Sequence, residues 1–211
     1  MKLRGRGGLF HPTLNIRNYL ERISNETKGK IILNLGSGDS RPIPHAINVY
    51  ILRGNEVDII ADVHHLPFKN ECADGVVLIT VLEHVKNPSE VILETWRVLR
   101  NAGLIYCEIP FLEPFHAAPK DYWRTTKDGI EELFKDFKRI DSGVCIGPGS
   151  TVTWILMEYP RALFGDNFFS ALVRAMLAVV LSPLKYLDKF INEKNAFELA
   201  SAVYFYGEKR H

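Results

Sequence analysis

Residues 31–40 read IILNLGSGDS, and this stretch decides the fold of the chain. Four of its first five residues are apolar, as in a buried strand, and two glycines one residue apart follow directly. Glycine lets the backbone turn sharply and lets a ligand approach the main chain closely. Because ligands of open α/β sheets bind at the carboxyl ends of the strands, we expect Gly36, Ser37, Gly38 and Asp39 to form the floor of a nucleotide-like site.

The dinucleotide-binding fingerprint is incomplete in this stretch. A Gly-x-Gly-x-x-Gly motif would need glycine at position 41, where the chain has Arg41. A pyrophosphate also binds at a helix N-terminus, and Pro42 and Pro44 leave little room for a helix. These residues favour a ligand without phosphates. On this motif alone, a tight turn without a ligand remains an alternative.

The composition is that of an ordinary globular domain, with 211 residues, 46% hydrophobic and 24% charged. The formal net charge of +1 produces no overall attraction to nucleic acid, so we expect no nucleic-acid partner. Residues 1–30 are more basic than the rest, which favours a solvated arm, with contact to an anionic surface as the alternative.

The three cysteines, Cys72, Cys107 and Cys145, are far apart and form no Cys-x-x-Cys pair. Such spacing is typical of buried thiols in a reducing compartment. The start of the chain has a basic head but no apolar segment behind it, so no signal peptide is expected. These features predict a cytoplasmic protein.

Short apolar runs predict a parallel sheet that is covered on both faces. Helices are expected over residues 12–24, from Asn87-Pro88 to a stop at Gly103, and over 125–137 with a threonine cap. Asn87 is expected to cap the second of these helices. Seven strands are expected, at residues 30–36, 46–51, 57–62, 74–80, 104–110, 138–147 and 201–209.

The connections between the first three strands are short. Only residues 39–45 separate the first two strands, whereas a parallel crossover usually takes a dozen or more residues. We therefore expect the crossover helices to be reduced to loops. One face of the sheet would then be exposed unless the N-terminal helix or another subunit covers it.

Residues 148–195 predict a helical insertion before the last strand, with helices over 150–164 and 167–191. The second helix is apolar, but Arg174 and Pro183 interrupt it, and a membrane span needs ~20 clean apolar residues. The favoured interpretation is a helix packed on the domain or on a second copy in a homodimer. A substrate lid and an interfacial membrane helix remain alternatives.

The predicted architecture is one α/β domain over 1–211, with an N-terminal helical segment (1–29) and the insertion (148–195). Its centre is a Rossmann-like, mostly parallel, seven-stranded sheet with shortened first and second crossovers.

From about residue 30 to residue 147 the chain resembles the class I S-adenosylmethionine-dependent methyltransferases. The resemblance is closest to small-molecule methyltransferases found with polysaccharide-building genes. It is carried by LNLGSG (33–38), DIIADVHHLPF (58–68) and ADGVVLITVLEHVKNPSEVILETWRVLRNAGLIYCEIPF (73–111). It implies S-adenosyl-L-methionine as cofactor and methyl transfer to a small or glycan-like acceptor, at oxygen.

The resemblance also implies roles for individual residues. Gly36, Ser37 and Gly38 match the turn under the amino-acid end of the cofactor. The residues that match the position at the adenine edge are Asp62, Val63 and His64. The residues that match the stretch after the fourth strand, which lines the cofactor, are Thr80, Val81 and Leu82. A turn cap for Asp62 and strand-end packing for the last set remain alternatives.

One position departs from the family pattern. The acid that accepts hydrogen bonds from both ribose hydroxyls is replaced here by Tyr50, whose phenol offers one uncharged oxygen. Asp39 or Asn48 are alternatives for that contact. If they do not replace the acid, cofactor binding is weak, which is the basis for a rival function as a non-catalytic binding or scaffold protein.

Methyl transfer is an in-line displacement that requires alignment, exclusion of water and, for some acceptors, removal of a proton. His116 and His84 are the candidate general bases, with structural hydrogen bonding as the alternative for each.

Tyr122, Trp123 and Arg124 are the candidate substrate residues, with loop anchoring as the alternative. The adjacent His64 and His65 lack the partner spacing of a metal site, so no metal is predicted. The basic start and helix 167–191 also allow a membrane-peripheral methyltransferase acting on lipid-linked sugars.

Overall fold

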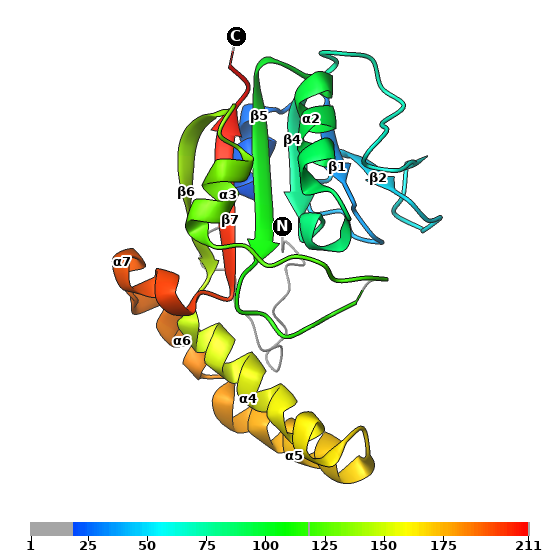
Figure 1. Cartoon of the computed structure of the whole chain (residues 1–211). Coiled ribbons are helices and arrows are strands. Elements are labelled where there is room, and N and C mark those ends of the chain that lie inside the picture. Colours follow the sequence, from blue (N-terminus) through cyan, green and yellow to red (C-terminus); the bar gives the residue numbers. More distant parts are fainter. Residues whose placement is uncertain (1–18, 118, 211) are drawn as a thin grey trace.

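A computed structural model of the chain describes residues 19–117 and 119–210. The seven predicted strands are present and form one sheet in the order β3-β2-β1-β4-β5-β7-β6 (Figure 1). Strand β7 runs antiparallel to β5 and β6, and the other neighbours are parallel, as predicted. The strands are β1 Ile32–Leu35, β2 Ile47–Tyr50, β3 Ile59–Ile60, β4 Ala73–Ile79, β5 Leu99–Pro110, β6 Lys138–Ile146 and β7 Ala202–Glu208.

Helices cover both faces of this sheet. Helices α2 (Pro88–Val98) and α3 (Lys127–Leu133) pack on one face, and α1 (Leu20–Glu26) packs on the other (Figure 1). Leu20 and Ile23 of α1 join the second core cluster, so this helix covers part of the face that the short crossovers leave open. The first residues of the predicted helix 12–24 lie outside the described part of the chain.

Two details of helix α2 differ from the prediction. The helix ends at Val98 and not at Gly103, because Leu99 already pairs with Ala73 as the first residue of β5. The Asn87 side chain does not cap the helix; its amide donates to the Glu90 carboxylate at 2.8 Å. The threonine cap of α3 is confirmed, since the Thr126 hydroxyl accepts from the Gly129 N–H at 3.1 Å.

The first two crossovers are loops, as predicted, and one arginine joins them. Arg41 donates to the Ala46 carbonyl at 2.8 Å in the first loop. It also donates to the carboxylates of Glu56 at 2.8 Å and Asp58 at 2.9 Å, which both lie in the second loop. The residue that breaks the dinucleotide motif therefore fastens two loops that have no helix of their own.

The insertion contains two long helices, as expected from the sequence: α4 (Pro148–Phe164) and α5 (Phe168–Leu181). The second was predicted to run to residue 191, but it ends at Leu181, because Pro183 has no N–H with which to continue the helix. Four short segments follow: α6 Leu184–Leu187, η2 Asp188–Phe190, α7 Glu193–Ala196 and η3 Phe197–Leu199. The buried Asp188 carboxylate accepts from the N–H groups of Gly149 at 2.6 Å and Ser150 at 3.0 Å, and so fixes the start of α4.

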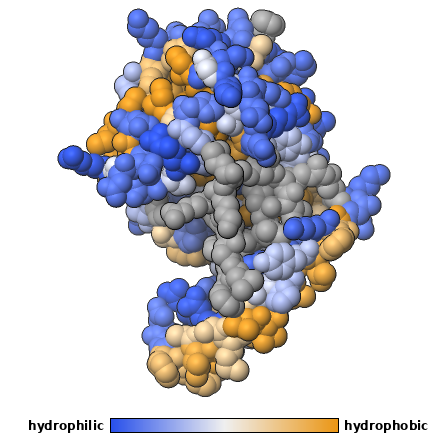
Figure 2. Space-filling view, turned by 180° about the vertical axis from the view of Figure 1, so that it is seen from behind, coloured by the Kyte–Doolittle hydropathy of each residue, from blue (hydrophilic) through white to orange (hydrophobic). Residues whose placement is uncertain are grey.

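Helix α5 packs on α4 and has no substantial contact with the sheet. Of the two favoured interpretations, packing on the domain is therefore wrong, and packing on a second copy stays a prediction. The α4–α5 hairpin projects away from the sheet (Figure 1). Hydrophobic side chains gather at that end of the molecule (Figure 2). The residues exposed on this hairpin include Ile155, Leu156, Tyr159, Leu163, Phe164, Phe168, Phe169, Leu172, Met176, Val179 and Val180. Among the described residues, one helical stretch, Phe168–Phe190, is long and apolar enough to cross a membrane by length and composition, and little of it is buried.

Candidate functional site

A cavity of about 1100 Å³ opens at the carboxyl ends of β1, β2, β4 and β5. Its walls contain nearly all the residues that the sequence predicts for cofactor binding. These are Gly36, Ser37, Gly38, Asp39, Tyr50, Asp62, Val63, His64, Thr80 and Val81. Leu82 is the exception, because its side chain is fully buried in the core cluster beneath the cavity.

The glycine turn depends on the absence of side chains. Gly36 and Gly38 have φ angles of 67° and 55°, in the left-handed region that favours glycine. A Cβ atom on Gly36 would lie 2.5 Å from a methyl group of Val81, whereas one on Gly38 would meet nothing within 4 Å. The turn therefore packs directly against the residues after β4.

The end of β2 carries Tyr50, which lines the cavity as expected for the departure from the family pattern. Asn48 is fully buried and donates to the carbonyls of Ser40 and Glu56, so it holds the two loops together and does not face the cavity. Asp39 lines the cavity, and one of its oxygens accepts from the Glu56 N–H at 2.8 Å. Of the two substitutes considered for the missing acid, Asp39 is the one in position.

Asp62 caps the turn that follows β3 while it lines the cavity. Its Oδ1 atom accepts from the His64 N–H at 2.9 Å and lies 2.6 Å from the His64 ring Nδ1. Burial by itself would raise the pKa of Asp62, but the hydrogen bonds from His64 outweigh it, and the pKa lies below its ordinary value. The Asp62 carboxylate is therefore ionised, and one of its two oxygens is already hydrogen-bonded to His64.

The end of β4 has an unusual backbone conformation at Thr80, whose φ angle is 51°. A β-branched residue rarely adopts this region, which costs of order 1–3 kcal/mol. The Thr80 N–H donates to the Glu108 carbonyl at 3.0 Å, which ties the end of β4 to β5. The strained residue directs the chain into the short helix η1 (Leu82–His84) beside the cavity.

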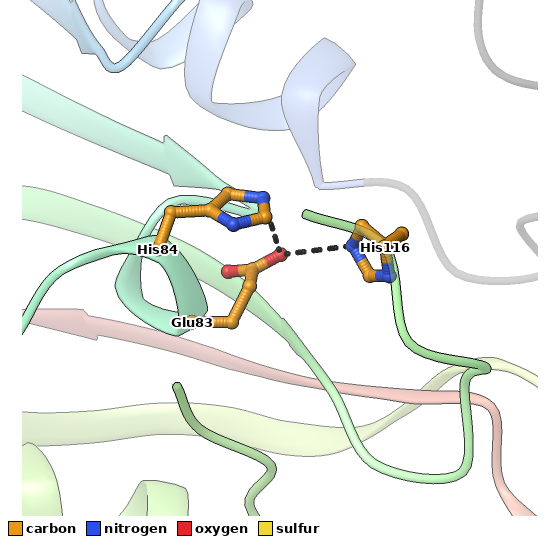
Figure 3. A group of neighbouring side chains, drawn as sticks. All are labelled: Glu83, His84 and His116. Atoms are coloured by element: carbon orange, nitrogen blue, oxygen red, sulfur yellow. Dashed lines mark ion pairs between the residues drawn. The ribbon is translucent and has the colours of Figure 1, made fainter. Parts of the chain in front are cut away.

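Next to the cavity, Glu83, His84 and His116 form a cluster from two segments of the chain (Figure 3). The Glu83 carboxylate is fully buried, and its Oε1 atom lies 3.7 Å from His84 Nε2 and 3.8 Å from His116 Nε2. His84 lines the large cavity, and His116 stands behind it against Trp154 of α4. Glu83 raises the pKa of His116, although burial opposes this effect.

The loop after β5 is fastened by two of the three predicted substrate residues. Trp123 donates from its ring N–H to the Val85 carbonyl at 2.9 Å. Arg124 is paired with Asp121 and also donates to the carbonyls of Glu113 and Pro114. This geometry favours the loop-anchoring alternative for Trp123 and Arg124.

Tyr122 is the predicted substrate residue that reaches the cavity. It is exposed and lines the wall there, while its N–H donates to the Glu83 carbonyl at 2.7 Å. The loop is thereby tied to η1.

The ion pair of Asp121 and Arg124 stays ionised. Burial would raise the pKa of Asp121, but Arg124 and the His116 N–H lower it to about 2.

The cavity-lining residues that are not among the predicted site residues include Glu108 and Lys120. Glu108 is nearly fully buried at the end of β5, and the Tyr106 hydroxyl donates to it at 2.5 Å. A carboxylate at the carboxyl end of a strand was the signal that could have identified it. Lys120 lies in an irregular loop, where the sequence carries no such signal.

Comparison with known proteins agrees with this geometry. Residues 42–107 match the family model described as "Methyltransferase domain". A protein of Methanocaldococcus jannaschii, MJ0638, is 26% identical over 140 residues, which cover 65% of this chain and 55% of the relative. The chain thus aligns with about half the length of that curated relative.

Solved structures share the fold at low sequence identity. The [4+2]-cyclase SpnF has a TM-score of 0.58 at 12% identity, covering 90% of this chain and 79% of that one. A Burkholderia thailandensis 1,6-didemethyltoxoflavin-N1-methyltransferase with bound S-adenosylhomocysteine has a TM-score of 0.54 at 12% identity, covering 91% and 78%. A Haemonchus contortus phosphoethanolamine N-methyltransferase in complex with S-adenosyl-L-methionine has a TM-score of 0.54 at 17% identity, covering 92% and 53%.

The sheet order and the cavity at its carboxyl edge define the Rossmann-like class of proteins to which these neighbours belong. Within that class, residues 42–107 match the methyltransferase domain model, and solved neighbours with the same fold hold S-adenosyl-L-methionine or S-adenosylhomocysteine. Methyltransferases of this family use S-adenosyl-L-methionine as their cofactor.

Proposed function

We propose that this protein transfers a methyl group from S-adenosyl-L-methionine to an oxygen of a small-molecule or glycan-like acceptor. The observation that carries the proposal is the continuity of the cavity. It runs from the bare turn at Gly36 and Gly38 to Tyr122 and His84. Its volume of about 1100 Å³ slightly exceeds the usual range for ligand sites, ~300–1000 Å³, so it has room for a cofactor and an acceptor together.

The two ends of the cavity suit the two reactants. The glycine turn offers main-chain atoms to the amino-acid end of the cofactor, and Asp62 and Val63 lie where the adenine is expected. At the other end, Tyr122, Lys120 and His84 present a ring, a cation and an imidazole to the acceptor. A hydroxyl acceptor must lose its proton as it is methylated, and we assign this step to the cluster of Glu83, His84 and His116.

The names of two structural neighbours support a small acceptor but point to a different accepting atom. Both the toxoflavin-precursor enzyme and the phosphoethanolamine enzyme are named as N-methyltransferases. Oxygen is supported here by the ionisable cluster, because a neutral amine can attack a methyl group before it loses a proton. Mass and fragmentation analysis of the methylated product decides between the two atoms.

Titration with S-adenosylhomocysteine tests the proposal. We expect heat of binding and a rise in melting temperature. In a separate assay, labelled S-adenosyl-L-methionine should transfer its methyl group to sugar or small phenolic acceptors. Absence of both signals at millimolar ligand would favour the non-catalytic scaffold, for which Tyr50 in place of an acid is the supporting feature. The cyclase among the structural neighbours illustrates that the fold also serves other chemistry.

A membrane-peripheral location is a second candidate, favoured by the α4–α5 hairpin. The hairpin exposes more large apolar side chains than is usual for a helical hairpin surrounded by water. One of them is Phe168 at its tip, which is 84% exposed. In this arrangement the hairpin rests in one leaflet and the acceptor is a lipid-linked sugar. A homodimer that pairs two hairpins is the competing explanation. Cys107 and Cys145 are buried and form no disulfide, which supports the cytoplasmic side in either case.

A further inference from the structure

The cluster beside the cavity contains a buried carboxylate without a hydrogen-bond partner among the described residues. Glu83 is 0% exposed, and among the described residues neither of its carboxylate oxygens has a hydrogen-bond partner. Burying an ionised carboxylate without hydrogen bonds or a counter-charge is costly, so such groups normally bind a proton, a cation or a metal. The nearest candidates are the two histidine rings on either side of it (Figure 3).

Both rings are held with the same nitrogen facing Glu83. His84 Nδ1 lies 2.6 Å from the Lys120 carbonyl oxygen, and His116 Nδ1 lies 3.0 Å from the Pro114 carbonyl oxygen. A carbonyl only accepts, so each Nδ1 carries the proton. The Arg124 Nη2 atom also approaches His116 Nδ1, but at 3.5 Å it is farther away than the Pro114 carbonyl oxygen. The Nε2 atom of each neutral ring then has a lone pair, and both lone pairs face Glu83. This orientation is the one that histidine ligands of metals adopt, with the second ring nitrogen donating to a carbonyl.

The distances fit a shared ion better than direct hydrogen bonds. Glu83 Oε1 is 3.7 Å and 3.8 Å from the two Nε2 atoms, beyond hydrogen-bond range. Ligand atoms about 2.0–2.1 Å from a tetrahedral zinc ion lie roughly 3.3 Å from each other. The three donor atoms lie within 4.8 Å of one another, so small side-chain movements suffice to close the site.

We propose that Glu83, His84 and His116 bind a divalent transition-metal ion, with zinc the best match to two imidazoles and one carboxylate. Three protein ligands leave a coordination position open. Because His84 lines the large cavity, that position faces the expected acceptor.

The role of the ion, unlike its binding, depends on the proposed methyl transfer. An acceptor hydroxyl that coordinates the ion loses its proton to water more easily, because the ion stabilises the alkoxide. The alkoxide oxygen forms the bond to the methyl carbon. The pair of electrons of the breaking carbon–sulfur bond stays on sulfur, which leaves neutral S-adenosylhomocysteine.

Zinc titration of the full chain after treatment with a chelator tests the site. Calorimetry should show one zinc ion per chain, and cobalt in place of zinc should give the visible absorption of a low-coordinate site. His116→Ala and His84→Ala should each weaken zinc binding at least tenfold. His45→Ala, an exposed histidine away from the cavity, is the matched control and should bind as the wild type does.

Comparison of the wild-type chain with the two histidine variants separates a bound metal from a proton. If a protonated histidine neutralises Glu83 and no metal binds, the wild-type chain will bind zinc no better than the His84→Ala and His116→Ala variants, which overturns the proposal. His116 does not line the large cavity, so His116→Ala should keep its affinity for S-adenosylhomocysteine. Zinc binding without S-adenosylhomocysteine binding would reject the methyl transfer and retain the metal site; the reverse result would reject the metal site alone.

Discussion

Gly36 lies so close to Val81 that a single added carbon atom would come within 2.5 Å of the valine methyl group. This contact joins the turn after β1 to the segment after β4, and both line the cavity. Each side of the contact thus fixes the position of the other.

Gly36→Ala should therefore abolish binding of S-adenosylhomocysteine, or weaken it more than tenfold. Gly38→Ala pays a similar cost for its positive φ angle, about 1–2 kcal/mol, but meets no atom within 4 Å. Calorimetry on both variants separates the clash from the backbone strain. Gly36→Ala combined with Val81→Ala should recover part of the affinity, and no recovery would show that the contact is not what limits binding.

Tyr50→Glu should strengthen cofactor binding. The carboxylate restores the acceptor that the family usually places at the end of this strand, and a hydrogen bond to a charged group contributes about 1.5–3 kcal/mol. Titration with S-adenosylhomocysteine should show roughly a tenfold or greater gain. Tyr50→Phe is the control and should bind equally or more weakly; a weaker Tyr50→Glu variant would mean that the ribose lies elsewhere.

Arg41→Met should loosen both crossover loops. Its guanidinium bonds to Ala46, Glu56 and Asp58, and the two ion pairs lower the free energy of the folded state by about 1–3 kcal/mol together. Chemical denaturation should report that loss. Hydrogen exchange should rise in residues 51–58, and cofactor affinity should fall because Asp39 binds the same loop.

Arg41→Lys tests the geometry of that connection. A lysine keeps the charge but cannot form the fork of several bonds, so it should recover less than half of the lost stability. Lys135→Met removes an exposed pair with Glu132 and should leave stability nearly unchanged.

Asp188→Asn should destabilise the insertion. The Asp188 carboxylate accepts from two main-chain N–H groups at the start of α4 and from the Ser150 hydroxyl. Losing the charge should cost about 1–2 kcal/mol. Protease cleavage of the α4–α5 hairpin is expected to accelerate in the variant while the melting of the sheet changes little. Equal cleavage in both proteins would contradict the role of this cap.

Replacing Phe168 and Val180 by glutamate should prevent membrane binding if the hairpin rests in a leaflet. We expect the wild-type chain to float with vesicles that contain anionic lipid and the double variant to stay in the soluble fraction. Leu93→Glu is the matched control, since Leu93 is also exposed but lies on α2. Sedimentation without lipid measures the dimer; a dimer that the double variant abolishes would favour pairing of two hairpins.

The sequence by itself determined the order of elements and the position of the cofactor turn. Strands such as Ile32–Leu35 are largely apolar on both faces, which is typical of a covered parallel sheet, and Gly36 and Gly38 supply the positive φ angles of the turn that follows. These signals are local, so they can be found without knowing the fold. The end of α2 was placed wrongly at Gly103, because helical periodicity continues to Leu99 although β4 already pairs with that residue.

Only the tertiary structure decided which polar groups meet. Leu82 lies in the core, whereas His84, two residues later, lies at the cavity, because the chain turns between them in η1. His116 joins Glu83 from 33 positions further along, through a loop with no regular pattern. Spacing along the chain carries no information about such distances, since they follow from how β4 and β5 pair and where the loops between elements close.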